Sequence, residues 1–323
     1  MTTMRAAQFD GYGAPDVLHV SRVPQPDPSP GQVLVRVEAA GINPHDLLTR
    51  SGALKRVSGR TFPLGTGIDF AGEVVDPGGT TDFAAGEQVW GSLPAMKRHS
   101  TGAVADYVVV PADRIGPRPA HLTAVEAVSL VVTGTTALRA LEDIAGTAAG
   151  EKVLIRGAAG GVGLAAVQIA AALQADVTTL SSRKDTEALR ELGAVHTLDY
   201  RETAVNDLDR FDVIFDTVGT QLLAYRRHLT QHGRMVTIAF TSATAFAEIA
   251  ASSVHGRRRI RAFSSDAKRD LLDRVGALAT AGTLRPVVAS TFDIEEIAAA
   301  HVAQQTGGQR GKRIITMSAP TGG

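Results

Sequence analysis

A glycine-rich turn between an apolar strand and a long apolar helix is the part of this sequence best suited to chemistry. The strand is predicted at Lys152 to Arg156, the turn is "GAAGGVG" (Gly157 to Gly163), and "LAAVQIAAALQA" follows as the helix. In such a unit Gly160 lets the backbone approach a pyrophosphate and Gly163 lets the helix pack closely on the strand, while the free amides at the helix start face the anion. The pattern predicts a dinucleotide site.

The surroundings of the turn distinguish a cofactor site from simple strand–helix packing. Ala158 stands where the usual fingerprint has its first glycine, and small residues also serve close packing. A second strand, predicted at Asp176 to Leu180, follows the helix, and this order favours the cofactor. We expect the turn to contact the cofactor through Ala159, Gly160, Gly161 and Val162.

The residues after the second strand indicate which dinucleotide binds. An NAD site usually has an Asp or Glu there, about 20 residues after the glycines, to bind the ribose 2′-hydroxyl. This chain has "SSRKD", in which Ser182 can donate to a 2′-phosphate and Arg183 or Lys184 can neutralise it. The pattern predicts NADPH. Two alternatives remain open: these side chains only cap and solvate the next helix, or Asp185 is the missing acid and permits NADH.

Two later strands are predicted to complete the cofactor edge. Val213 to Asp216 and Arg234 to Ile238 have the apolar character of buried parallel strands. In open parallel sheets, ligands bind outside the carboxyl ends of the strands. We therefore expect Val218, Gly219, Ile238, Ala239 and Phe240 to lie beside the cofactor.

The sequence changes character near residue 123, which predicts two kinds of domain. Before it, short strands between turn residues indicate a β-rich domain. After it, strands alternate with Ala-rich helices, two of them predicted at Ala124 to Leu130 and Ala137 to Ile144, which is typical of a doubly wound parallel sheet. The expected fold class is α/β, with a β-rich part at 1–122, a nucleotide-binding part at 123–258, and a tail at 259–323 that rejoins the first.

Composition narrows the possible partners. Lys plus Arg equals Asp plus Glu at 33 each, so charge predicts neither nucleic acid nor an anionic membrane as a partner. We expect no apolar run to span a bilayer and no signal peptide, and hence a cytoplasmic protein. The chain has no Cys, which excludes disulfides, a catalytic thiolate and a thiolate-ligated zinc ion.

The order of several motifs resembles the zinc-free quinone oxidoreductase family of the medium-chain dehydrogenase/reductase superfamily. The resemblance extends over nearly the whole chain. It rests on "AAGINPHDLLTRSG", "GIDFAGEVV", "GAVADYVVVPADRI", "TGTTALRAL", the glycine turn, "LGAVHTLDYRE", "FDVIFDTVG" and "QRGKRIITM". It implies a GroES-like substrate domain formed by both ends of the chain, a Rossmann domain between them, and a nicotinamide held in a cleft.

The resemblance also implies further cofactor contacts. Thr136 resembles the Thr of the family that contacts the nicotinamide part, and Thr133 stands where relatives often have Lys. Tyr200 resembles the Tyr on the adenosine phosphate side, although a half-buried aromatic at a strand end is an alternative.

Matching positions indicate chemistry without zinc. Asn43 stands where metal-using relatives have their first cysteine, and Asp69 falls in the stretch of their Gly-His-Glu. Without a Lewis acid, the most compatible reaction is hydride delivery to a carbon made electrophilic by conjugation, as in quinones and α,β-unsaturated carbonyls. We expect Asn43 near the nicotinamide or the substrate carbonyl, unless Asn-Pro only initiates a turn.

The proton donor is less evident. Some relatives carry a Tyr shortly after the Asn-Pro turn, where this chain has Leu47, Leu48 and Thr49. His45 is the nearby titratable candidate, although a lone His is more often a packing residue, and His99 is a weaker one.

Three functions agree with these patterns. They are an NADPH:quinone reductase, an enoyl reductase of secondary metabolism, and a nucleotide-binding protein without turnover.

We also expect a homodimer, because the segment from Gly256 to Asp266, with Ile260 and Ala262 on one face, has the pattern of an exposed edge strand that can pair with a second copy. A monomeric mass in light scattering would contradict this expectation.

Overall fold

In the computed structural model, which describes residues 2–95, 97, 99–240, 242–264 and 266–317, the chain divides into two units. Unit 1 comprises Met1–Val132, Asp266–Thr280 and Pro286–Gly323, and unit 2 comprises Thr133–Ser265 and Ala281–Arg285. The boundaries differ from those expected near 123 and 259. One falls inside a continuous helix, and the other follows a strand that pairs with the sheet of unit 2.

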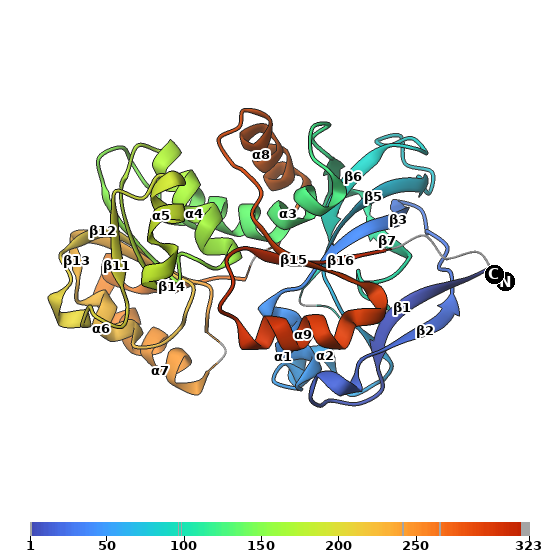
Figure 1. The fold of residues 1–323 in the computed structure, drawn as a ribbon, viewed down its shortest axis with the longest axis horizontal. Coiled ribbons are helices and arrows are strands. Elements are labelled where there is room, and N and C mark those ends of the chain that lie inside the picture. The colour runs from blue at the N-terminus through green and yellow to red at the C-terminus, as the bar shows by residue number, and fades with distance from the viewer. Residues whose placement is uncertain (1, 96, 98, 241, 265, 318–323) are drawn as a thin grey trace. The chain divides into compact units, whose positions relative to one another are not determined.

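Unit 2 is a doubly wound parallel sheet, as predicted. Its strands have the order β11-β10-β9-β12-β13-β14, which is the 3-2-1-4-5-6 order of a dinucleotide-binding fold. They are β9 (Lys152–Arg156), β10 (Asp176–Ser181), β11 (His196–Asp199), β12 (Phe211–Asp216), β13 (Leu229–Thr237) and β14 (Ile260–Ala262). Figure 1 shows α4 (Gly161–Ala172) and α5 (Thr186–Glu191) on one face, and α6 (Leu222–Arg226) and α7 (Ala243–Ser252) on the other.

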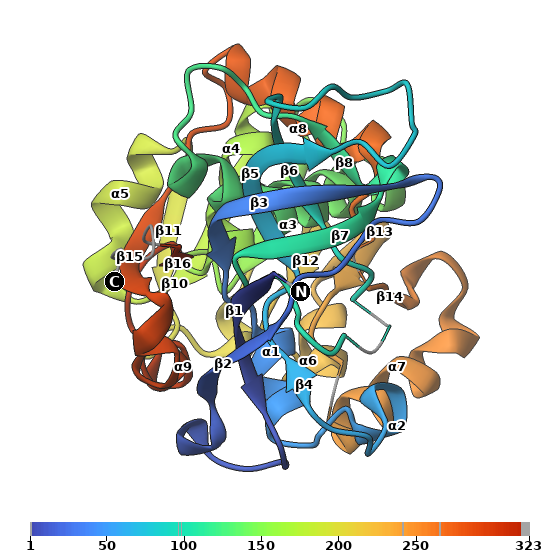
Figure 2. The same ribbon diagram turned by 90° about the vertical axis from the view of Figure 1, so that its right-hand side faces the viewer.

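Unit 1 is mainly β-structure, seen most clearly in Figure 2. Its seven-stranded sheet has the order β15-β16-β3-β5-β6-β8, with β7 also paired to β3, and a second sheet has the order β2-β1-β4. The strands are β1 (Thr3–Phe9), β2 (His19–Pro24), β3 (Gln32–Gly41), β4 (Leu64–Gly65), β5 (Asp69–Asp76), β6 (Gln88–Ser92), β7 (Tyr107–Pro111), β8 (Ile115–Pro117), β15 (Val288–Asp293) and β16 (Lys312–Thr316). Its core contains Phe9, Val35, Phe70 and Ile315, all fully buried.

The last strand brings the tail of the chain into the first domain. β16 pairs antiparallel with β3, so that Ile314 lies opposite Gly41 and Thr316 opposite Ala39. The helices of this unit are α1 (Pro44–Arg50), α2 (Lys55–Ser58), α8 (Arg269–Thr280) and α9 (Ile297–Thr306), and α9 contacts α1. The expected return of the C-terminal segment to the β-rich domain is therefore seen.

The two helices predicted at 124–130 and 137–144 form one continuous helix. α3 (Ala124–Leu138) runs directly into a π-helical segment, Arg139–Ile144. Gly134 and the β-branched residues around it have low helix propensity, but burial of this stretch overrides that preference. Contrary to expectation, Ala124–Ile144 also has the length and hydropathy of a membrane span; 78% of its most apolar window is buried inside the protein, as in a core helix.

Besides the short helix α2, two helices were not expected from the sequence. α1 begins where only an Asn-Pro turn was predicted, although Asn43 at the N-cap, Pro44 at the first position and Asp46 at the third are a recognisable start signal. α7 follows Ser242, whose hydroxyl accepts a hydrogen bond from the amide of Ala245. Both starts carry capping residues that the periodicity of short helices does not reveal.

β14 is the edge strand of the parallel sheet, as predicted, but it is shorter than the segment from 256 to 266. Only Ile260–Ala262 pairs with β13. Residues 253–258 form a 3-10 helix instead, and residue 265 lies outside the described residues. Ile260 is buried and Ala262 is exposed.

Candidate functional site

The glycine turn between β9 and α4 holds two glycines with different roles. A Cβ on Gly163 would lie 2.3 Å from the carbonyl oxygen of Gly157 and 2.7 Å from the Cα of Ala158. Gly163 is therefore required by the packing of α4 against the turn, as predicted. A Cβ on Gly160 would meet only the oxygen of Gly157, at 3.4 Å. The protein itself leaves the space at Gly160 open.

This open space lies at the start of α4. Gly160 is the N-cap residue and has no side chain to occupy the free amides of the first turn. These amides and the helix dipole attract an anion. β9 and β12 are neighbours at the point where the strand order reverses, which is where such sheets bind nucleotides. The residues present therefore fit a dinucleotide pyrophosphate.

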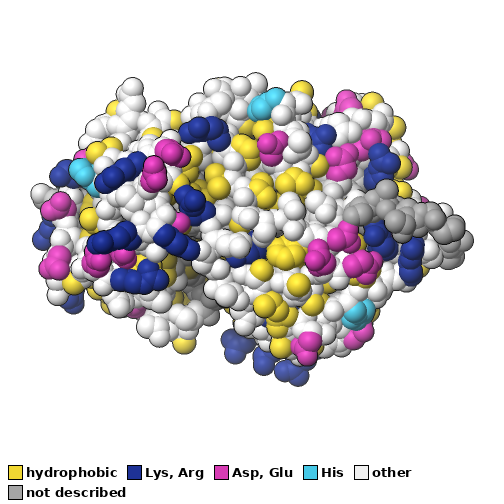
Figure 3. Space-filling view, viewed as in Figure 1, with side chains coloured by type: hydrophobic (Ala, Val, Ile, Leu, Met, Phe, Trp, Pro, Cys, Tyr) yellow, Lys and Arg dark blue, Asp and Glu magenta, His cyan; other side chains and the backbone are white. Residues whose placement is uncertain are grey.

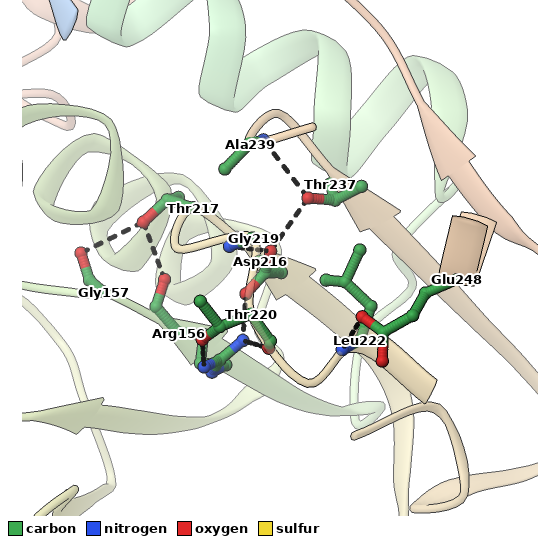
Figure 4. A network of polar contacts seen from close by, with 10 residues as sticks. All are labelled: Arg156, Gly157, Asp216, Thr217, Gly219, Thr220, Leu222, Thr237, Ala239 and Glu248. Carbon is green, nitrogen blue, oxygen red and sulfur yellow. Dashed lines mark hydrogen bonds and ion pairs between the residues drawn. The ribbon is translucent and has the colours of Figure 1, made fainter. Parts of the chain in front are cut away.

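A buried ion pair between Arg156 and Asp216 joins the ends of the neighbouring strands β9 and β12 (Figure 4). Arg156 ends β9, and its Nη1 donates to Asp216 Oδ1 at 2.6 Å and to the carbonyl oxygen of Thr220 at 2.7 Å. Its guanidinium also lies 3.8 Å from the ring centre of Tyr225. Both charged side chains are buried, at 8% and 0% exposed, so the pair is compensated inside the unit.

The other oxygen of Asp216 fixes the predicted cofactor edge. Asp216 Oδ2 accepts from the amide of Gly219 at 2.8 Å and from the hydroxyl of Thr237 at 2.8 Å, and the amide of Ala239 donates to that hydroxyl oxygen at 3.2 Å. Gly219 has a φ of +79°, and a Cβ there would lie 2.2 Å from the carbonyl oxygen of Ala239. The network thus holds two of the expected cofactor residues side by side.

The remaining residues of that edge are partly accessible. Val218 is 46% exposed, Ile238 is half-buried, and Phe240 makes an edge-to-face contact with Phe246 of α7 at 6.1 Å between ring centres. An exposed valine beside the glycine turn is suited to an apolar contact with a ligand.

The segment after β10 presents basic side chains at the surface. Arg183 and Lys184 are exposed, and Arg183 pairs with Glu202. The hydroxyl of Ser182 accepts from Nη1 of Arg201 at 3.0 Å. Figure 3 shows basic side chains gathered among acidic ones over the part of this face that carries α5 and β11. Arg201, which the sequence reading missed, thus joins the predicted phosphate site.

Two acidic residues lie near this segment, one buried and one already bonded to backbone amides. Asp185 is only 4% exposed, so its carboxylate is not presented at the surface. Asp199, at the end of β11, accepts from the amide of Arg201 at 2.9 Å and from the amide of Arg183 at 3.2 Å. Arg183, Lys184 and Arg201 are exposed basic side chains in this part of the chain.

Tyr200 is more accessible than a half-buried strand-end aromatic. Its side chain is 53% exposed, and the guanidinium of Arg201 lies 4.5 Å from its ring centre. Such a stacked cation and aromatic ring can contact a phosphate and a flat base together.

Thr133 and Thr136 lie in α3 and are both buried, at 4% and 3% exposed. Among the described residues, the hydroxyl of Thr136 has no hydrogen-bond partner. A buried hydroxyl without a partner is costly, and a bound ligand is one way to satisfy it.

In unit 1, Asn43 and Asp69, which the resemblance aligns with the ligand region of metal-using relatives, form a buried triad with Lys312. The amide nitrogen of Asn43 donates to Asp69 Oδ1 at 2.7 Å. Lys312 Nζ, from β16, donates to Asn43 Oδ1 at 2.5 Å and to Asp69 Oδ2 at 2.7 Å. All three side chains are at least 95% buried. A lysine ammonium thus balances the carboxylate, and Asn43 is more than a turn residue.

No cluster of three or more His, Asp or Glu side chains with metal-binding geometry occurs in the part of the chain that the structure describes. Lys312 was not recognised from the sequence. A lysine within an apolar strand, as in "GKRIITM", is a signal from which its buried charged partner could have been predicted.

A pocket lies next to the triad on unit 1. His45, Asp46 and Thr49 of α1 line it together with His99 and Lys97 of the segment after β6. The imidazole of His45 is 24% exposed and its Nδ1 lies 3.8 Å from Asp46 Oδ1. The structure therefore brings the two histidines singled out in the sequence into one pocket.

Comparison with known proteins agrees with this architecture. Residues 29–120 match the family described as "Alcohol dehydrogenase GroES-like domain", and residues 192–315 match "Zinc-binding dehydrogenase". The zinc in the second description belongs to that family as a whole.

Three proteins illustrate the similarity. The chain is 31% identical to the mitochondrial NAD(P)H oxidoreductase RTN4IP1 of Danio rerio, over 98% of this chain and 92% of that protein. It is 30% identical to 2-methylene-furan-3-one reductase of Solanum lycopersicum, over 97% and 79%. The structure of the quinone oxidoreductase from Coxiella burnetii superposes with a TM-score of 0.90 at 29% identity, covering 98% of this chain and all of that one.

Proposed function

Since the chain belongs to the quinone oxidoreductase-like family of the medium-chain dehydrogenase/reductase superfamily, we propose that it is an NADPH-dependent reductase of quinones or α,β-unsaturated carbonyls that works without zinc. The observation that carries this proposal is the buried triad of Asn43, Asp69 and Lys312. It places an ammonium group against Asn43 and Asp69, the two residues that the resemblance aligns with the ligand region of metal-using relatives. A substrate that is already activated by conjugation needs no metal to accept hydride.

The chain's own residues bind and orient the reactants. When bound, NADPH supplies a hydride. The amides at the start of α4 would hold the pyrophosphate, and the edge at Gly219 and Ala239 would limit where the rest of the cofactor lies. Thr136 offers its hydroxyl to the nicotinamide end. In this mechanism the protein contributes to the rate by holding the reactants in position.

A reductase and a nucleotide-binding protein without turnover share all of these binding features. The decisive experiment measures NADPH consumption with 1,4-benzoquinone and with cyclohex-2-enone side by side, with and without a chelator. We expect turnover of at least one acceptor and no effect of the chelator. Binding of NADPH without consumption would support the non-catalytic alternative, and loss of activity with the chelator would contradict a zinc-free reaction.

The preference for NADPH rests on Ser182, Arg183, Lys184 and Arg201, together with the burial of Asp185. A charge-assisted hydrogen bond contributes about 1.5–3 kcal/mol, and about 1.4 kcal/mol corresponds to a tenfold change in affinity. We expect fluorescence titration to show at least about tenfold tighter binding of NADPH than of NADH.

Variants can test which side chains cause the preference. Arg201→Ala and the double variant Arg183→Ala/Lys184→Ala should each weaken NADPH binding and leave NADH binding nearly unchanged. Arg190→Ala, an exposed arginine in the last turn of α5, is the matched control and should change neither. Equal affinity of the native protein for both nucleotides would refute the preference.

A further inference from the structure

The pocket on unit 1 contains polar atoms that lack partners. Its walls come from α1, from the segment around β4, and from the residues after β6. Two of its buried atoms, His45 Nδ1 and Thr49 Oγ1, have no hydrogen-bond partner among the described residues. Leu54, Leu64 and Ile68 supply the apolar part of the lining. An apolar pocket with a few convergent polar groups is the usual form of a small-molecule site.

A fixed carboxylate stands beside His45. Asp46 Oδ2 accepts from the amide of Asn43 at 2.7 Å, and Asp46 Oδ1 accepts from the amide of Gly67 at 3.1 Å. These two bonds hold the carboxylate at the ion-pair distance of 3.8 Å from the imidazole. Because Asp46 is itself buried, its charge acts on His45 with little screening by water.

The environment gives the two histidines of the pocket opposite protonation preferences. Burial lowers the pKa of His45, but the carboxylate of Asp46 and the backbone of Ala95 outweigh it, so that this pKa lies above its ordinary value. Burial lowers the pKa of His99, and the charges of His45 and Lys97 lower it further, against a hydrogen bond to the carbonyl of Pro94. One imidazole of the pocket favours its charged form and the other its neutral form.

A third histidine, on α9, also acts on the carboxylate of Asp46. Behind Asp46, His301 of α9 has a pKa lowered to about 4, chiefly by burial, and is therefore neutral near pH 7. It lies between the hydroxyl of Thr66 and the guanidinium of Arg50. Pairs of titratable groups whose environments separate their pKa values mark acid and base roles in active sites.

We propose that His45 is the general acid of this reductase and donates a proton to the carbonyl substrate. The proposal rests on the proposed function and names its proton donor. Leu47, Leu48 and Thr49 follow His45 on α1, so no tyrosine stands at these positions to act as the proton donor. Asp46 raises the pKa of the imidazole and is a positioning residue.

The step balances for an α,β-unsaturated carbonyl. The hydride pair forms a C–H bond at the β-carbon, the electrons of the C=C bond shift toward the carbonyl, and the α-carbon or the oxygen takes the proton of His45. The N–H bond of the imidazolium breaks, and the resulting neutral imidazole recovers a proton from water. A quinone differs, because hydride produces a hydroquinone anion that is phenolate-like, with a pKa of about 10, and water can protonate it.

The two substrate classes therefore provide the test. General acid catalysis contributes about 10²–10⁴-fold, so His45→Gln should lower kcat with cyclohex-2-enone by about 100-fold. With 1,4-benzoquinone the same variant should lose less than about tenfold. His19→Gln, on the exposed strand β2, is the matched control and should change neither rate.

The pH dependence gives an independent readout. His45 must be protonated, so the rate with the enone should be full at low pH and fall as the pH rises through the raised pKa of His45. This fall should disappear in His45→Gln and persist in His99→Gln. If His45 has a purely structural role, His45→Gln should lower the rates with both substrates equally and leave the shape of the pH profile unchanged.

Each outcome is decisive. Selective loss of enone reduction with loss of the pH-dependent fall supports His45 as the acid. Equal loss with both substrates, or no loss, overturns this proposal and leaves the reductase function intact. A native protein that binds NADPH but reduces neither substrate overturns the proposed function, and the role of His45 with it.

Discussion

Lys312→Met should lower the free energy of unfolding of unit 1 by about 3–5 kcal/mol, because it leaves the carboxylate of Asp69 buried without its cation. Asp69 is fully buried, and among the described residues the side-chain amide of Asn43 would be its one remaining side-chain donor. Trp90 is the only tryptophan of the chain and is buried in this unit, so its fluorescence during urea unfolding reports the effect directly.

A second variant and a control test whether the unpaired carboxylate of Asp69 causes this loss of stability. Adding Asp69→Asn removes the unpaired charge, so the double variant should recover much of the lost stability, although each substitution alone destabilises. Lys268→Met breaks an exposed pair with Asp113 at 3.7 Å and should change stability by less than about 0.5 kcal/mol. If Lys312→Met costs no more than this control, the triad does not stabilise unit 1 as described.

Gly160→Ala and Gly163→Ala should separate binding of the cofactor from folding of the turn. The new methyl group at Gly163 would overlap the carbonyl of Gly157, so we expect a loss of about 1–3 kcal/mol in the stability of unit 2 and a loss of NADPH binding. At Gly160 the methyl group enters open space, and the φ of −74° suits alanine. We expect nearly unchanged stability and at least about tenfold weaker NADPH binding, because the pyrophosphate can no longer approach.

Thermal unfolding followed by circular dichroism, together with NADPH titration, distinguishes the two glycines. Gly160→Ala and Gly163→Ala serve as controls for each other, since the substitution is identical and the positions are three residues apart. Unchanged NADPH affinity in Gly160→Ala would show that no phosphate lies at the start of α4.

The sequence predicted most of the parallel sheet because its strands are short apolar runs of distinct character. β9 has the bounds expected for it, and β10 and β12 differ from the prediction by at most two residues at one end. Helices were harder to predict. Two helices were predicted where α3 and the segment after it form one, because helix propensity is weak where packing buries the helix. α1 and α7 are short, so their capping residues, Asn43 and Ser242, carried more information than periodicity.

Of the candidate site, the backbone elements were easier to predict than the side-chain partners. Gly163 was assigned its packing role from spacing alone, and the geometry agrees. The partners of Asn43 come from β5 and from β16 near the end of the chain, and no local pattern joins Asn43 to Lys312. The pairing of Arg156 with Asp216 also depends on which strands become neighbours. Arg201 follows the next strand, and only its contact with Ser182 identifies it.

The central claim is that this chain transfers hydride from NADPH to a conjugated carbonyl acceptor. The most direct measurement uses NADPH carrying deuterium at C4 of the nicotinamide, prepared in both stereochemical forms, with cyclohex-2-enone as the acceptor and mass spectrometry of the product. We predict that one of the two forms delivers one deuterium to the β-carbon of cyclohexanone. A product without deuterium from either form, or the absence of product from a protein that binds NADPH, would contradict the account.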